Sequence, residues 1–139
     1  MKYDLDVVTL MSHLEDLSTL YHAIVGAGII HILDKPHEIT LFAPENEAFA
    51  KLQGGTIISA LEDIEKAKTI LTYHAVPQKL MASDLRKQKS VTTLQGGMLT
   101  IEEHHWLRHG IKVNDAVVKE ADIEGTNGVI HIIDAVLMP

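Results

Sequence analysis

The chain has 139 residues, of which 46% are hydrophobic and 22% are charged, and its net charge at neutral pH is −7. This composition is typical of one soluble folded domain, here residues 1–139, and the mixing of acids and bases argues against nucleic acid or an anionic membrane surface as the main partner. The sequence contains no cysteine, which excludes disulfides, thiolate metal sites and a cysteine nucleophile.

Helical spacing dominates the first part of the chain. Apolar residues recur three and four positions apart across residues 7–27, and Ser18 as an N-cap predicts two helices there rather than one. Gly26 and Gly28 are expected to end the second helix, because glycine is common just after a helix. Residues 34–36 predict a loop.

A short apolar strand is predicted at residues 39–43, and Pro44 ends it. Asn46 is expected to cap a short helix that Gly54 and Gly55 break, and Thr56 is expected to cap the next one. Helical spacing then continues over residues 64–74 until Pro77 stops it.

The pattern changes to that of strands after residue 90. Residues 90–101 predict a hairpin around Gly96 and Gly97, residues 102–110 a polar hairpin tip, and residues 114–115 a turn before another strand. Helices that precede a meander of short strands indicate the α+β class.

The last stretch begins with Asn127 and Gly128, which predict a hairpin turn because both residues tolerate a positive φ. Residues 129–138 are almost continuously apolar, interrupted only by His131 and Asp134, so they predict two short buried strands or one bent strand. No Gly-x-Ser-x-Gly elbow accompanies His131 and Asp134, so a catalytic pair and an enzyme are not expected.

Three blocks, taken in order, resemble the fasciclin domain. Residues 40–49 are similar to the first homology box of this family, residues 71–76 carry its Tyr-His pair, and residues 127–139 are similar to its second homology box. We expect structural roles for the following box residues: Thr40, Phe42, Ala43, Pro44, Asn46, Phe49, Asn127, Gly128, His131 and Asp134. The closing stretch is expected to pair beside the strand of the first box.

The resemblance implies a fasciclin-like wedge, in which a β-sandwich of short strands packs against a bundle of short helices. It also implies a non-catalytic cell-adhesion module, extracellular or at the cell surface, that binds a protein or a surface polysaccharide and requires no cofactor. We expect a monomer or weak self-association. The charged start of the chain is unlike a signal peptide, and the longest apolar run, residues 23–30, is shorter than the roughly 20 residues of a membrane helix, so membrane insertion is not expected.

The resemblance also singles out candidate contact residues. Tyr73 and His74, and the segment containing Glu120, Asp122 and Ile123, match regions assigned to integrin binding in animal matrix members of the family. Position 121 is alanine where that motif often has proline.

Each of these candidates has a structural alternative. The structural alternative for His74 is a buried histidine bonded to Thr40 or to a backbone carbonyl of the first box. The alternative for Asp122 is that it marks the end of a strand whose Ile123 packs inward. Trp106 is a plausible contact residue if it is exposed at the hairpin tip, and a cover for the sandwich if it folds back.

His104, His105 and His109 are the most metal-like cluster in the sequence. If residues 102–109 were helical, His105 and His109 would share one face, as zinc ligands can. In a hairpin tip these histidines would not share a face, and they would be solvent-exposed loop residues. Binding of a small molecule or a metal at this loop is therefore the alternative function, while no metal site is assigned.

Overall fold

The structure is a computed structural model that describes residues 3–33, 38–51 and 63–139. The predictions for residues 34–36 and for Gly54, Gly55 and Thr56 lie outside the described residues. The helices of the described part are α1 (Val7–Ser12), the short 3-10 helix η1 (Glu15–Leu17), α2 (Ser18–Ala27), α3 (Ile30–Leu33), α4 (Asn46–Ala50), α6 (Ile64–Thr72) and α7 (Ala82–Leu85).

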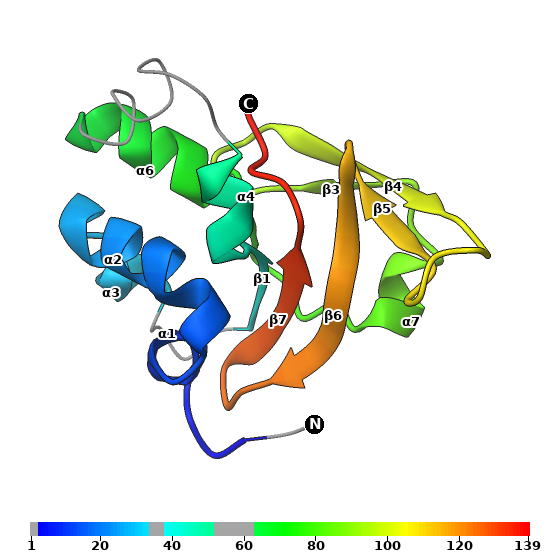
Figure 1. The fold of residues 1–139 in the computed structure, drawn as a ribbon, viewed down its shortest axis with the longest axis horizontal. Coiled ribbons are helices and arrows are strands. Elements are labelled where there is room, and N and C mark those ends of the chain that lie inside the picture. The colour runs from blue at the N-terminus through cyan, green and yellow to red at the C-terminus, as the bar shows by residue number, and fades with distance from the viewer. Residues whose placement is uncertain (1–2, 34–37, 52–62) are drawn as a thin grey trace.

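The strands are β1 (Ile39–Pro44), β2 (Ala75–Val76), β3 (Ser90–Thr92), β4 (Met98–Glu103), β5 (Ile111–Val113), β6 (Ala116–Glu124) and β7 (Gly128–Ile133). They form a seven-stranded sheet in the order β2-β1-β7-β6-β5-β4-β3 (Figure 1). The meander from β3 to β7 matches the prediction, whereas the sequence pattern revealed neither β2 nor α7. The predicted pairing of the two homology boxes is confirmed, because β1 and β7 run parallel and in register along their whole length.

Helix α2 is capped by a neighbouring residue at its C-terminal end and by a residue distant in sequence at its N-terminal end. Gly28 ends the helix with a left-handed φ of 72°, as predicted. Ser18 is the first residue of the helix and not its N-cap as predicted, and the N-cap Leu17 makes no side-chain hydrogen bond. The side-chain oxygen of Asn46 accepts the N–H of Thr19 at 2.9 Å instead. The amide of Asn46 also donates to the carbonyl of Glu15. The prediction that Asn46 caps its own helix is therefore wrong, because the side chain joins α4 to the start of α2.

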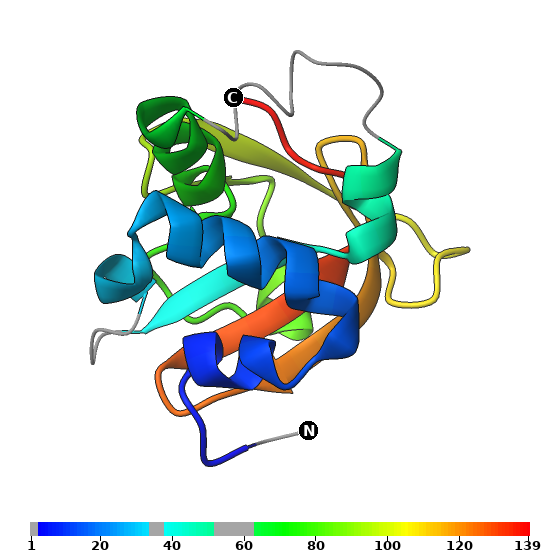
Figure 2. The same ribbon diagram turned by 60° about the vertical axis from the view of Figure 1, so that its left-hand side comes forward.

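Two apolar cores lie on opposite sides of β1 and β7. Every residue of both strands is buried. Alternate side chains such as Leu41 and Ile130 pack among helices α1, α2, α3 and α6, which Figures 1 and 2 show gathered on one side of the sheet. Phe42 and Ile133 face the second core, which is lined by the remaining strands and by α7. The apolar run of the second box is therefore one strand buried on both faces.

The sheet curls until its two ends nearly meet. The backbone N–H of Leu94, just after β3, donates to the carbonyl of Ala75 in β2 at 2.8 Å. The second core fills the inside of this curl, as in a small barrel. The molecule thus combines helices with one nearly closed sheet, and the expected β-sandwich is not confirmed.

The hairpin predicted at Asn127 and Gly128 is present, but the reason given for it, a positive φ at these residues, is wrong. A hairpin does join β6 to β7, but neither residue has a positive φ. The buried side chain of Asn127 accepts the N–H of Val7 at 2.9 Å and donates to the carbonyl of Leu33 at 2.8 Å. A Cβ at Gly128 would lie 2.0 Å from the carbonyl oxygen of Ile39, so glycine permits close packing of β7 on β1.

Candidate interaction surface

His74 lies inside the protein, with a relative exposure of 1%. Its Nδ1–H donates to the carbonyl of Ile70 at 2.8 Å, and its Nε2 accepts the N–H of Leu137 at 2.8 Å. This arrangement requires the neutral ring, and burial lowers the pKa of His74 to about 4, although the hydrogen bond to Ile70 opposes the shift. His74 is a hydrogen-bonded core residue, but its side chain bonds neither to Thr40 nor to a carbonyl of the first box.

Tyr73 is also buried, and its hydroxyl bonds within the molecule. The hydroxyl donates to the carbonyl of Met98 at 3.0 Å and accepts a hydrogen bond from the side chain of Asn114 at 3.2 Å. In this structure the pair formed by Tyr73 and His74 therefore offers neither ring to a partner.

Asp122 forms a bulge within β6 and does not mark the end of the strand. Its φ is 61°, and the pairing with β7 changes register between Glu120 and Ile123. The carboxylate accepts the N–H of Ala82 at the start of α7 at 2.7 Å, while its own N–H donates to Nδ1 of His131 at 3.2 Å. Ile123 is half-buried and packs against the helical core, as the structural alternative anticipated.

His131 is the second buried neutral histidine. Its Nε2–H donates to the carbonyl of Leu80 at 2.7 Å, and its ring stacks on Phe42 with centroids 5.8 Å apart. Burial lowers the pKa of His131, while the hydrogen bond to Leu80 and the charge of Asp122 oppose that shift. His131 thus joins β7 to the segment before α7.

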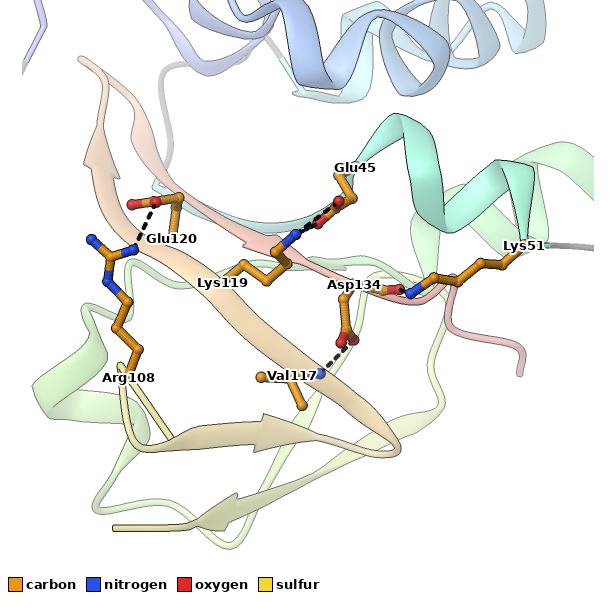
Figure 3. Close-up of polar contacts among 7 residues, drawn as sticks. All are labelled: Glu45, Lys51, Arg108, Val117, Lys119, Glu120 and Asp134. Carbon is orange, nitrogen blue, oxygen red and sulfur yellow. Dashed lines mark hydrogen bonds and ion pairs between the residues drawn. The ribbon is translucent and has the colours of Figure 1, made fainter. Parts of the chain in front are cut away.

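Asp134 follows β7 and bonds to neighbouring backbone and side chains. Its carboxylate accepts the N–H of Val117 at 2.8 Å, and its carbonyl accepts a hydrogen bond from Lys51 at 3.4 Å (Figure 3). These contacts fasten the C-terminal segment to β6 and to the end of α4.

Charged side chains cover the outer face of β6. Figure 3 shows Arg108 reaching from the loop between β4 and β5 toward Glu120, with 3.7 Å between the charged atoms. Lys119 contacts the carboxylate of Glu45 at 2.9 Å, and this hydrogen bond raises the pKa of Lys119. Lys119 and Glu120 are adjacent and both exposed because the register with β7 shifts between Val118 and Glu120.

The sequence did not single out Arg108, Lys119 or Glu45. Glu45 and Lys119 are 74 positions apart, and no local pattern indicates that they meet. Two adjacent charged residues inside a predicted strand were the only available signal for the bulge, because a regular strand places neighbours on opposite faces.

Trp106 is exposed at the tip of the β4–β5 loop, with 79% of its surface accessible. The ring of His104 packs against the indole with centroids 4.5 Å apart and an angle of 59° between the planes. Nε2 of His104 lies 3.4 Å from the carboxylate of Glu102. The backbone N–H of His104 donates to the carbonyl of Gly110 at 3.0 Å. Trp106 therefore projects from an ordered loop and does not cover the core.

The loop geometry gives no support to a metal site. Residues 104–110 form turns, so His105 and His109 do not share a helical face. In the described part of the chain, which includes this whole loop, no three His, Asp or Glu side chains are grouped so that they could hold a metal ion. Within the same described ranges, no helix is long and apolar enough to cross a membrane.

Comparison with known proteins identifies relatives along almost the whole chain. The chain is 38% identical over 124 residues to the uncharacterized protein sll1735 of Synechocystis sp., and the matched region covers 89% of this chain and 90% of that protein. It is 36% identical to the transforming growth factor-beta-induced protein ig-h3 of Sus scrofa, over 88% of this chain but 17% of that protein. The cell surface glycolipoprotein MPB83 of Mycobacterium bovis is 35% identical, over 96% of this chain and 60% of its own length.

A solved structure shares the fold. The FAS1 domain pair of the insect cell adhesion molecule fasciclin I matches with a TM-score of 0.76 at 23% identity, over 97% of this chain and 51% of that chain. The family model of the Fasciclin domain matches residues 15–139. The three motif blocks, the nearly closed sheet and these matches agree, and the chain belongs to the fasciclin domain family.

Proposed function

We propose that the chain, as a single domain of residues 1–139, is a non-catalytic cell-adhesion or cell-surface interaction module. Its contact surface, which we name the β6 face, consists of Trp106, Arg108, Lys119 and Glu120. Family membership supports the general role, because a relative is named a cell surface glycolipoprotein and the matching fold comes from a cell adhesion molecule. We place the protein outside the cell or at its surface, as a monomer or weakly self-associating, with a protein or a glycan as its partner.

The exposure of Trp106 is the observation that carries this proposal. Tryptophan is enriched at binding hot spots, since it brings a large rigid surface at a small cost in conformational entropy. Here 79% of it is exposed on a loop whose base is closed by hydrogen bonds, and the loop is tied to β6 through Arg108 and Glu120. Tyr73 and His74, in contrast, are buried and bonded inside the molecule.

Asp122 supports the β6 face indirectly in this proposal. It lies in the register shift that follows Glu120 in β6, and its carboxylate is bonded to the start of α7. Ile123 is half-buried against the helical core and contributes in the same structural way. Of the contact candidates that the sequence singled out, we therefore assign direct contacts to Glu120 and Trp106 and a supporting role to Asp122 and Ile123.

The test is attachment of cells to surfaces coated with the purified protein. Trp106→Ala and Glu120→Ala are expected to reduce attachment, because each removes an exposed contact without opening the core. Met98→Ala is the matched control, since Met98 is also an exposed apolar residue, 57% accessible, at the opposite end of β4. Equal attachment by the Trp106→Ala and Met98→Ala variants, with unchanged thermal midpoints, would remove the β6 face as the contact surface.

A further inference from the structure

We infer that the partner of the Trp106 loop is a neutral polysaccharide, with a sugar ring stacked on the indole. This inference rests on the proposed function and names the partner class of the same surface. Three features of the described residues lead to it: the isolation of the aromatic ring, the balance of charge around it, and the rigidity of its support.

Trp106 has no exposed apolar neighbour in its loop. Among the described residues the large exposed apolar side chains are Val25, Ile64, Leu94, Met98, Trp106 and Met138, and only Trp106 belongs to residues 104–110. The buried core of a protein–protein interface is usually more apolar than the surrounding surface. At this tip the adjacent apolar side chain, Leu107, is only partly exposed, so the indole stands largely alone. A pyranose ring presents the complementary pattern, because one face carries C–H groups and its rim carries hydroxyls. The C–H groups are attracted to the negative face of the indole.

Charges around the loop are nearly balanced. Glu102 faces Lys112 across the β4–β5 pair, and Arg108 pairs with Glu120. The carboxylate of Glu103 and the guanidinium of Arg86, which bonds to this loop, add one charge of each sign. Recognition of a sulfated glycan, a strongly basic peptide or an acidic peptide requires a surface dominated by one sign. The balanced rim therefore favours an uncharged partner that both donates and accepts hydrogen bonds.

The indole already has a ring contact in the free protein. His104 packs on one side of it, and His104 is itself held by Glu102 and by the backbone of Gly110. The guanidinium of Arg86 donates to the carbonyl of His109 at 2.8 Å, which fastens the loop to the end of α7. Ordering the ring in the free protein reduces the entropy lost on binding.

The rim supplies partners for sugar hydroxyls. The side chain of Arg108 is 76% exposed and carries several N–H donors, and that of Glu120 is 52% exposed and accepts hydrogen bonds. A hydroxyl group both donates and accepts, so it is satisfied by either side chain. The loop thus provides an apolar face beside polar groups of both kinds.

Affinity electrophoresis through gels that contain a soluble neutral polysaccharide tests the inference. Galactomannan, xyloglucan, dextran and laminarin are the probes, with heparin and an oligolysine peptide as charged comparisons in fluorescence titrations. Because Trp106 is the only tryptophan, a blue shift of its emission reports contact at the loop directly. We expect retardation by at least one neutral polysaccharide, with little dependence on salt because the contact is uncharged.

Variants make the result specific to the ring. Trp106→Phe is expected to retain weakened binding, Trp106→Ala to bind about tenfold more weakly, and Met98→Ala to bind like the unmodified protein. The inference is overturned if no neutral polysaccharide retards the protein, if only heparin or oligolysine shifts the emission, or if Trp106→Ala binds as well as the unmodified chain. Cell attachment that depends on Trp106 without polysaccharide binding would leave the proposed function standing and remove only this inference. Polysaccharide binding by a protein to which cells do not attach would keep the sugar contact at Trp106 and remove the proposed role in cell attachment.

Discussion

At the scale of single residues, the two buried histidines act as uncharged connectors. Each ring donates one N–H to a backbone carbonyl and accepts a backbone N–H at its other nitrogen. The tautomers are opposite, because the carbonyl partner lies at Nδ1 in His74 and at Nε2 in His131, and a carbonyl can only accept. A protonated ring would direct a second N–H at a backbone N–H, so both connections require the neutral form.

The first prediction concerns His74→Ala. The variant removes a fully buried ring, leaves the carbonyl of Ile70 and the N–H of Leu137 unpaired, and should lower the free energy of unfolding by about 3 kcal/mol. Urea unfolding followed by circular dichroism measures the loss. His105→Ala is the control, because His105 is exposed on the loop and its removal should change stability by less than about 0.5 kcal/mol. Similar losses in both variants would contradict the connecting role of His74.

The second prediction separates the backbone requirement of Asp122 from its charge. Asparagine tolerates a positive φ and keeps an oxygen for the N–H of Ala82, whereas alanine does neither. Asp122→Ala should therefore cost about 1–2 kcal/mol more than Asp122→Asn, visible as a lower thermal midpoint. If the two variants melt together, the carboxylate does not hold α7 in the way described. Any loss of cell attachment in Asp122→Ala should accompany this loss of stability.

At the scale of elements, the contact of β1 with β7 depends on the absence of a side chain at Gly128. The parallel pair lies inside the sheet, between β2 and β6, and contributes to both cores, so its spacing affects the whole fold. Gly26 in helix α2 lacks such a constraint, because a Cβ there would meet nothing within 4 Å.

The third prediction uses these two glycines as a matched pair. Gly128→Ala should destabilise the protein by at least about 3 kcal/mol or prevent folding, because the new methyl group meets the backbone of Ile39 and neither strand can move without its neighbours. Gly26→Ala should stabilise it by about 0.5–1 kcal/mol, because alanine restricts the unfolded chain and favours helix. Thermal unfolding of the two variants checks both signs. A Gly128→Ala protein as stable as the unmodified chain would show that β7 does not pack this closely.

At the scale of the whole molecule, the buried histidines make stability depend on pH. The ordinary pKa of histidine is 6.5, while that of folded His74 is about 4 and that of His131 is also lowered. Above pH 6.5 both rings are neutral in the folded and unfolded chain, and stability is complete. Between pH 6.5 and about 4 the unfolded chain binds protons that the folded chain does not, so stability falls as pH falls.

The fourth prediction follows from that sign. His74 alone should reduce the free energy of unfolding by about 3 kcal/mol over this range, and His131 should add to the loss. Urea midpoints measured at successive pH values give the slope, and the slope should be smaller in His74→Gln, whose side chain does not titrate. A slope that is the same in the variant, or stability that rises on acidification, would show that His74 is not neutral in the folded protein.

Much of the fold was predictable from local sequence. Gly28 ends its helix, the glycines at residues 96–97 lie between β3 and β4, and the turn at residues 114–115 joins β5 to β6, as expected. These features depend on the conformational preferences of a few adjacent residues, which are visible in the sequence. The motif blocks indicated the family for a related reason, since they combine such preferences with a fixed order along the chain.

The sequence by itself thus indicated most of the helices, the hairpins from β3 to β6 and the family of this protein, and its sole tryptophan as a contact candidate. Only the tertiary structure decided what Asn46, Asn127 and Asp122 do, because the partner of each lies far away in the chain. Asn127 and Val7 are 120 positions apart, and no local preference predicts that they meet. The tertiary structure likewise placed the Tyr73 and His74 rings inside and left Trp106 outside. The curl of the sheet decided which polar side chains complete internal hydrogen bonds and which remain available to a partner.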